Sequence, residues 1–175
     1  MTRLQAVCAV LVAVLTLVLL VGSAVPVFAQ DGCSYSDGDT LYCPAGIACN
    51  FALQIDIGGG GPSNQHWFVD KAGNVLGVTF AGRGNAMTYT NLSNGKTMST
   101  AANGSVTRYT FNPDGSTTVA AKGHNILILY PTDVPAGPST TLYTGQVVYT
   151  VDTNAVSTVV KTSGKSLDIC AALAK

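Results

Sequence analysis

Two segments of the chain alternate large apolar residues with polar ones. Within residues 51–57 the apolar side chains occupy every second position, with Gln54 and Asp56 between them. Residues 143–151 show the same period. The apolar and aromatic side chains of Tyr143, Val147, Tyr149 and Val151 share one face, and Thr144, Gln146 and Thr150 lie on the other. A period of two places successive side chains on opposite faces of a β-strand. Both segments are therefore predicted to be half-buried strands.

A third apolar segment, residues 126–130, does not alternate. Its continuous run of Ile, Leu and Tyr is typical of a strand that is covered on both faces, so we expect it near the centre of a sheet. Residues 131–138 follow, and they contain Pro131, Pro135 and Pro138. Proline cannot donate to a β-ladder, so this loop is predicted to be a stiff, extended crossing between two sheets.

Turn signals separate the apolar segments at the spacing of a meander. Glycine, asparagine and aspartate tolerate the positive φ that hairpin turns need, and they cluster at residues 70–74, 94–95, 103–104, 113–115, 152–154 and 163–165. This punctuation predicts an antiparallel meander of about ten short strands in one domain, arranged either as a sandwich or as a barrel.

The composition supports the all-β interpretation. All nine acidic residues are aspartate, and the chain contains no glutamate. Glutamate is a good helix former, whereas aspartate favours caps and turns. The formal net charge is zero, without a block of either sign, so nucleic acid is not an expected partner.

The N-terminal residues 1–29 have the features of a cleaved signal peptide. Arg3 precedes the apolar residues 4–21, Pro26 breaks the helix, and Ala29 ends a run of suitable cleavage residues. A retained membrane anchor is the alternative, because the apolar stretch is just long enough to span a bilayer. No cluster of Lys or Arg follows it, so we expect a secreted, extracellular protein that leaves the membrane after cleavage.

Four of the five cysteines remain after the leader: Cys33, Cys43, Cys49 and Cys170. In a secreted chain they are expected to form disulfides, and four cysteines allow three pairings. Cys33 and Cys43 bracket a turn at residues 36–39, while Cys49 opens the first alternating strand and Cys170 ends the last. This arrangement favours Cys33–Cys43 with Cys49–Cys170. It also divides the mature chain into a disulfide-bonded loop segment, 30–48, and a β domain, 49–175.

Motifs for catalysis or metal binding are missing from the sequence. Without glutamate, neither a His-Glu-x-x-His zinc site nor an EF-hand is possible. There is no Gly-x-Ser-x-Gly elbow. The glycines of residues 57–62 lack the Lys-Ser/Thr of a phosphate loop and are predicted to form a flexible hairpin loop instead. We therefore predict no enzymatic activity, no metal and no cofactor.

Four residues are the candidates for a ligand site: His66, Trp67, His124 and Asp133. Trp67 either fills the core of the domain or, if exposed, stacks on a sugar ring or a partner's apolar group. The first hypothesis is a non-catalytic structural or surface-binding domain with a cell-surface or carbohydrate partner. The second is a small-ligand or carbohydrate module, with a pocket near residues 58–67 and the proline loop at its mouth. A hydrolase with a spatially assembled site is a distant third.

Several short sequence segments resemble those of a group of uncharacterised secreted bacterial β-rich proteins. They are residues 89–96, 123–125, 133–138 and 167–173, so the resemblance covers most of the chain from Cys49 onward. It implies a β fold and supports pairing Cys49 with Cys170. It implies no activity, and residues 33–43 lie outside the shared pattern.

Overall fold

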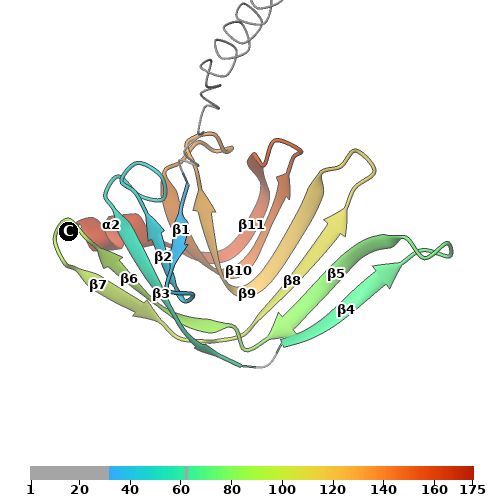
Figure 1. Ribbon diagram of the computed structural model, residues 1–175, viewed down its shortest axis with the longest axis horizontal. Coiled ribbons are helices and arrows are strands. Elements are labelled where there is room, and N and C mark those ends of the chain that lie inside the picture. The colour runs from blue at the N-terminus through green and yellow to red at the C-terminus, as the bar shows by residue number, and fades with distance from the viewer. Residues whose placement is uncertain (1–31, 62) are drawn as a thin grey trace, which may run out of the picture. The chain divides into compact units, whose positions relative to one another are not determined.

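The computed structural model describes residues 32–61 and 63–175, and the predicted signal peptide lies outside these residues. The described residues form eleven strands in two antiparallel sheets, followed by the short helix α2 (Ile169–Ala174) (Figure 1). This confirms the all-β prediction. Neither sheet closes on itself within the described part of the chain, so the sandwich describes the architecture and the barrel does not.

In each sheet the strands lie side by side in the order in which they occur along the chain. The five-stranded sheet contains β1 (Ser34–Ser36), β2 (Thr40–Cys43), β3 (Leu53–Gly60), β6 (Asn85–Asn91) and β7 (Thr97–Thr100). The six-stranded sheet contains β11 (Ser157–Asp168), β10 (Ser139–Val151), β9 (Thr117–Leu129), β8 (Ser105–Phe111), β5 (Val75–Gly82) and β4 (Ser63–Val69).

The chain passes between the sheets along its strands. β3 leads into β4, β5 into β6, and β7 into β8 (Figure 1). The strands β3 to β6 thus form one long hairpin, whose β3–β6 part belongs to the smaller sheet and whose β4–β5 part belongs to the larger one. The predicted hairpin loop at residues 57–62 is therefore wrong. Gly58 to Gly60 belong to β3, where Gly60 pairs with Asn85, and a Cβ at Gly61 would lie 2.8 Å from the Cβ of Arg83. The glycines allow a close approach of two strands instead of a chain reversal.

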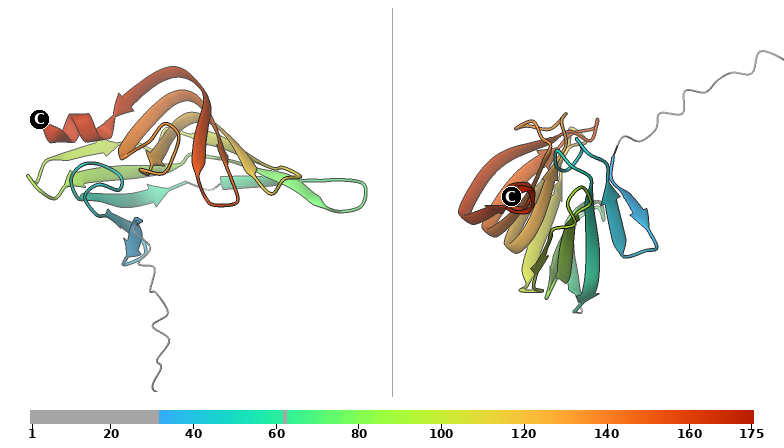
Figure 2. Two further views of the ribbon diagram at one scale, coloured as in Figure 1. Left: turned by 90° about the horizontal axis from the view of Figure 1, so that it is seen from above. Right: turned by 90° about the vertical axis from the view of Figure 1, so that its left-hand side faces the viewer.

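The predicted turn at residues 163–165 is wrong for the same reason. These residues lie inside β11, where Gly164 pairs with Gly145, which in turn pairs with Gly123 of β9. A Cβ on Gly145 would collide with the carbonyl oxygen of Ser163. The glycines in this row permit close packing across three strands. β10 and β11 arch strongly, as Figure 2 shows.

The central position of residues 126–130 is confirmed. β9 lies between β8 and β10, and each face of its second half packs in a separate apolar cluster. Ile126 and Ile128 pack against the core that faces the five-stranded sheet, whereas Leu127 and Leu129 belong to a second cluster with Val147. The continuous apolar run fits this position, because each face of the segment packs in an apolar cluster.

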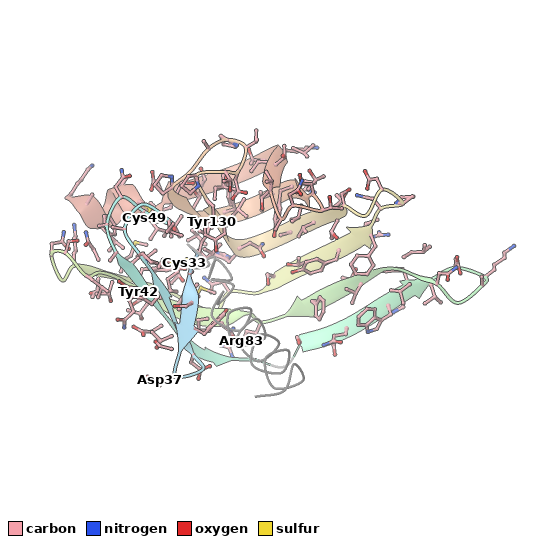
Figure 3. The ribbon with its side chains drawn as sticks, turned by 45° about the horizontal axis from the view of Figure 1, so that its top comes forward. Cys33, Asp37, Tyr42, Cys49, Arg83 and Tyr130 are labelled. Atoms are coloured by element: carbon pink, nitrogen blue, oxygen red, sulfur yellow. A yellow bond between two sulfur atoms is a disulfide. The ribbon has the colours of Figure 1, made fainter. Side chains whose placement is uncertain are left out.

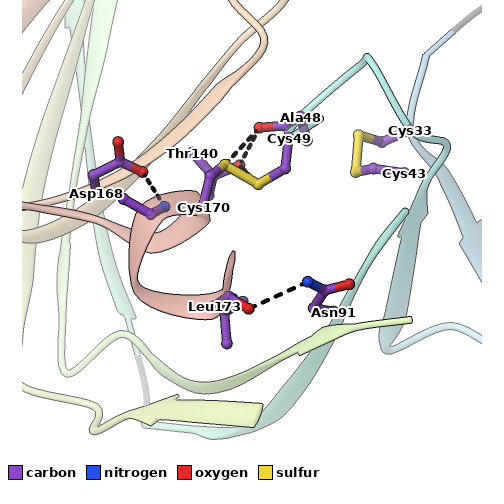
Figure 4. The surroundings of a disulfide bond; sticks show 10 residues. Cys33, Cys43, Ala48, Cys49, Asn91, Thr140, Asp168, Cys170 and Leu173 are labelled. Carbon is purple, nitrogen blue, oxygen red and sulfur yellow. Dashed lines mark hydrogen bonds between the residues drawn. A yellow bond between two sulfur atoms is a disulfide. The ribbon is translucent and has the colours of Figure 1, made fainter. Parts of the chain in front are cut away.

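The closed end of the domain is the five-stranded sheet, α2, the second half of β9 and the first half of β10. Its core contains fully buried side chains from β3, β6 and α2, namely Leu53, Tyr89, Ile169 and Leu173. Both predicted disulfides are present, and Cys49–Cys170 joins two points 121 residues apart (Figure 4). Residues 34–43 are part of this end as strands β1 and β2, because β2 pairs with β3. The expected loop segment is therefore an edge of the sheet.

Cys170 lies in α2 and does not end a strand as predicted. The Asp168 carboxylate accepts a hydrogen bond from the Ala171 backbone N at 2.9 Å, which caps the helix (Figure 4). Alanine-rich residues then favour the helical turn. At its other end, the Leu173 carbonyl accepts from the Asn91 side chain at 3.2 Å.

The proline loop 131–138 connects neighbouring strands of one sheet, β9 and β10, so the predicted crossing between sheets is wrong. The loop folds back onto β11 instead. The Val134 N donates to the Ser157 carbonyl at 2.8 Å, and the Val159 N donates to the Val134 carbonyl at 2.7 Å. These bonds satisfy backbone groups of a segment whose prolines prevent a regular ladder.

Candidate ligand-binding surface

The four predicted site residues do not converge on one cavity. Trp67 lies on the edge strand β4 and is 53% exposed, so it does not fill the core. His66 is its neighbour and points to the opposite face of the sheet, because successive strand residues alternate. His124 is exposed on β9. Asp133 is buried in the proline loop.

Asp133 has a structural role in this loop. Its carboxylate accepts hydrogen bonds from the backbone N of Tyr130 at 2.6 Å and of Ser157 at 2.7 Å. Its two oxygens thus connect the end of β9 to the start of β11. Both oxygens are engaged by the fold, so Asp133 is not part of the ligand-binding surface.

Trp67 belongs to a row of residues that crosses all six strands of the larger sheet. The pairing register places six side chains opposite one another in succession: Trp67, Val78, Tyr109, Val119, Tyr149 and Val159. Residues paired directly across antiparallel strands share a face. Aromatic rings therefore occupy every second strand, with valines between them. We call this side of the sheet the aromatic face.

The geometry of the aromatic face follows from strand spacing. Because neighbouring strands are separated by about 4.8 Å, rings on alternate strands are roughly 10 Å apart. Exposure falls along the row, from Trp67 at the edge to the half-buried Tyr109 and Tyr149. Burial raises the pKa of Tyr149 above its usual value, and the nearby Tyr109 raises it further. Tyr149 thus remains a neutral phenol at ordinary pH and offers its hydroxyl group.

Polar groups flank the rings on the aromatic face. In the next row, Gln65 pairs with Phe80, and Phe80 pairs with Thr107. The Phe80 ring contacts Tyr109 edge-on, with ring centroids 5.8 Å apart. Such edge contacts orient the rings. The face therefore combines oriented aromatic surfaces with amide and hydroxyl groups at their margin.

A pocket of about 270 Å³ lies beside His124, where β8 and β9 separate from the smaller sheet. Arg83, Asn85, Asn103 and Ser105 also line it, and its lining contains no carboxylate. Figure 3 shows Arg83 at the junction of the two sheets. The pocket supplies several hydrogen-bond donors, and its electrostatics favour groups that accept hydrogen bonds or carry negative charge.

A second pocket, of about 370 Å³, lies under the β1–β2 hairpin. Leu41, Ile55, Ile57 and Ile126 contribute to a mostly apolar lining, and Tyr149 reaches it from the end of the aromatic row. Polar side-chain groups come from Ser157 and two tyrosines. This pocket is suited to an apolar group but contains few of the convergent polar groups that orient a ligand.

Two further properties concern residues 32–61 and 63–175. No helix in this part of the chain is long and apolar enough to cross a membrane. Nor do three or more His, Cys or Asp side chains gather there in a way that could hold a metal ion.

No protein-family model matches the chain, and no match was found among curated proteins or solved structures.

Proposed function

We propose that this protein is a secreted, non-catalytic module that binds a polysaccharide through the aromatic face. The observation that carries the proposal is the row of Trp67, Tyr109 and Tyr149 on alternate strands. Sugar rings have apolar C–H faces, which stack on aromatic rings, and hydroxyl edges, which need hydrogen-bonding partners. The aromatic face provides both kinds of group.

The spacing of the rings favours an extended chain over a single sugar. Rings that are roughly 10 Å apart on a regular sheet contact successive parts of a linear polymer. Each contact is weak by itself, because one sugar ring on one aromatic ring removes only a small apolar area from water. Several such contacts along one chain add up to useful affinity. A flat or extended polysaccharide is therefore the expected ligand class.

The disulfides are consistent with an extracellular location. Cys33–Cys43 and Cys49–Cys170 fit an oxidising environment. A module that holds on to a polysaccharide outside the cell needs to persist there. The signal-peptide features of residues 1–29 agree with that location.

The apolar pocket under the β1–β2 hairpin supports a small-ligand function less well. Its lining has few polar groups to orient a molecule. Trp67, in contrast, is half exposed on the edge strand β4 and is accessible to a polymer.

The test is a binding assay with insoluble cellulose, chitin and peptidoglycan. Trp67 is the single tryptophan, so its fluorescence reports contact directly. We expect at least one of these polysaccharides to bind and to shift the Trp67 emission. Trp67→Ala and Tyr109→Ala are each expected to weaken binding about tenfold, which corresponds to about 1.4 kcal/mol.

Tyr42→Ala is the matched control. Tyr42 is 39% exposed but lies on β2 of the other sheet, outside the aromatic face. Its removal is expected to leave binding unchanged. If Trp67→Ala binds like the unmodified protein, or if Tyr42→Ala weakens binding equally, the aromatic face is not the binding surface.

A further inference from the structure

The side of the six-stranded sheet opposite the aromatic face collects basic side chains from three strands. Arg108 of β8 and Lys161 of β11 lie in one row, which the register connects through Ala120 and Val148. Lys122 of β9 and Lys165 of β11 lie on the same face, opposite Gln146 and Thr144 of β10. All four basic side chains are exposed. We call this side the basic face.

No described aspartate lies in the paired strand rows that carry the cations of the basic face. Asp70, Asp114 and Asp152 are in hairpin turns, and Asp133 is buried. The others lie in the β1–β2 turn, on β3 and at the start of α2, namely Asp37, Asp39, Asp56 and Asp168. The rows that hold the four cations therefore contain no carboxylate, although the whole chain has a formal net charge of zero.

Hydroxyl groups accompany these cations. One row of the same face places four threonines side by side on neighbouring strands, namely Thr110, Thr118, Thr150 and Thr158. His124 pairs with Thr144, which pairs with Lys165, so the basic face continues towards the pocket that Arg83 lines. Cations and hydroxyls thus form an array on a regular sheet. Arg108 and Lys161 are three strands apart in this array, which corresponds to a separation of roughly 14 Å.

We propose that the basic face binds an anionic polysaccharide, one that carries carboxylate or sulfate groups along its chain. The charge of the face complements that of such a polymer, and threonine hydroxyls between the cations match its hydroxyls. Because the basic and aromatic faces are opposite sides of one sheet, this binding does not depend on the proposed function of the aromatic face.

Other polyanions fit this face less well. Single-stranded nucleic acids need free aromatic surfaces on which bases stack. The aromatic ring of this face, Phe68, is covered by the Arg108 guanidinium at 4.7 Å and contacted by His66 at a centroid distance of 4.8 Å. A membrane surface is usually bound with apolar side chains that enter the bilayer, whereas four neighbouring strands carry threonines in one row here.

The experiment measures binding to dextran sulfate and to alginate, with unmodified dextran as the neutral control. Affinity for both charged polymers is expected to fall steeply with salt. Lys122→Gln with Lys161→Gln is expected to weaken binding about tenfold at low salt. Lys71→Gln with Lys175→Gln removes the same charge from exposed positions outside the face and is expected to change binding less than twofold.

Three outcomes would overturn the proposal. They are equal effects of the two double substitutions, equal binding to neutral dextran, and tighter binding to single-stranded DNA or to anionic phospholipid vesicles than to either charged polymer. Trp67→Ala separates the two proposals, because it is expected to leave dextran sulfate binding intact while it weakens binding through the aromatic face. Circular dichroism and a melting curve confirm that each variant is folded.

Discussion

The closed end and the wing of this domain differ in what their apolar residues do. The wing consists of β4, β5 and β8. In the closed end, Leu53, Tyr89, Ile169 and Leu173 are completely buried, and two disulfides fasten the surrounding segments. In the wing, only Val78 of the large apolar side chains is buried, while others are about half exposed, namely Trp67, Val69, Val75, Leu76, Val106 and Phe111.

This difference separates stability from binding. Apolar burial contributes free energy in proportion to the area removed from water, so the closed end supplies most of it. The wing has a single layer and presents both faces to solvent. It is held by its ladder and by its continuity with the closed end. A rigid anchor thus supports an exposed surface, which is the arrangement expected of a binding module.

The largest expected effect comes from opening the long disulfide. Cys49→Ser with Cys170→Ser removes the constraint on a segment of 121 residues, and the chain-entropy model predicts a loss of about 4–5 kcal/mol in the free energy of unfolding. Urea denaturation measures it. Below the new melting temperature, polysaccharide binding is expected to be unchanged. A loss of binding in the folded variant would show that the two ends are not independent.

A matched pair of leucines gives the next effect. Leu53→Ala in the closed end is expected to cost about 2–5 kcal/mol, because it leaves a cavity in a fully buried site. Leu76→Ala in the wing is expected to cost less than about 0.5 kcal/mol, because that side chain is 48% exposed. Similar losses for both variants, measured by chemical denaturation, would contradict the assignment of stability to the closed end.

Alkaline pH is expected to have a smaller effect. Burial raises the pKa of Tyr89 in the closed end and of Tyr149 on the aromatic face above the usual value. The unfolded chain therefore loses these protons first as pH rises. Stability should stay constant below about pH 10 and fall above it. In Tyr89→Phe and in Tyr149→Phe, melting curves between pH 8 and 11 should show a shallower decline, and an unchanged decline in both would rule out these groups as its cause.

Much of the fold was predictable because local patterns carried it. The alternation at residues 143–151 correctly predicted a half-buried strand, and the continuous run at 126–130 correctly predicted a central strand with an apolar cluster on each face. The glycines were misinterpreted because the same residue serves turns and close strand contacts. Gly145 and Gly164 face each other across a ladder, and nothing in the local sequence shows what a glycine's neighbour in space is.

The candidate site was predictable only in part. Trp67 was identified as a candidate. Whether its side chain lies in the core or on the surface depended on whether a second layer covers β4, which the sequence does not show. Tyr109 and Tyr149 were missed, although Tyr149 stood out in its strand by parity. Only the pairing register of the strands brings positions 67, 109 and 149 into one row, and this register is not visible in the local sequence.

The sequence by itself determined the class of structure, an all-β, antiparallel chain, and among three possible cysteine pairings it favoured the one that the structure contains. Period and turn chemistry are local quantities, and the positions of cysteines can be counted along the chain, so all three could be interpreted without coordinates. Only the tertiary structure decided that aromatic rings gather on one face and cations on the other. Faces are made from strands far apart in the chain, and their composition depends on pairing register, where a slip of one residue reverses every side chain.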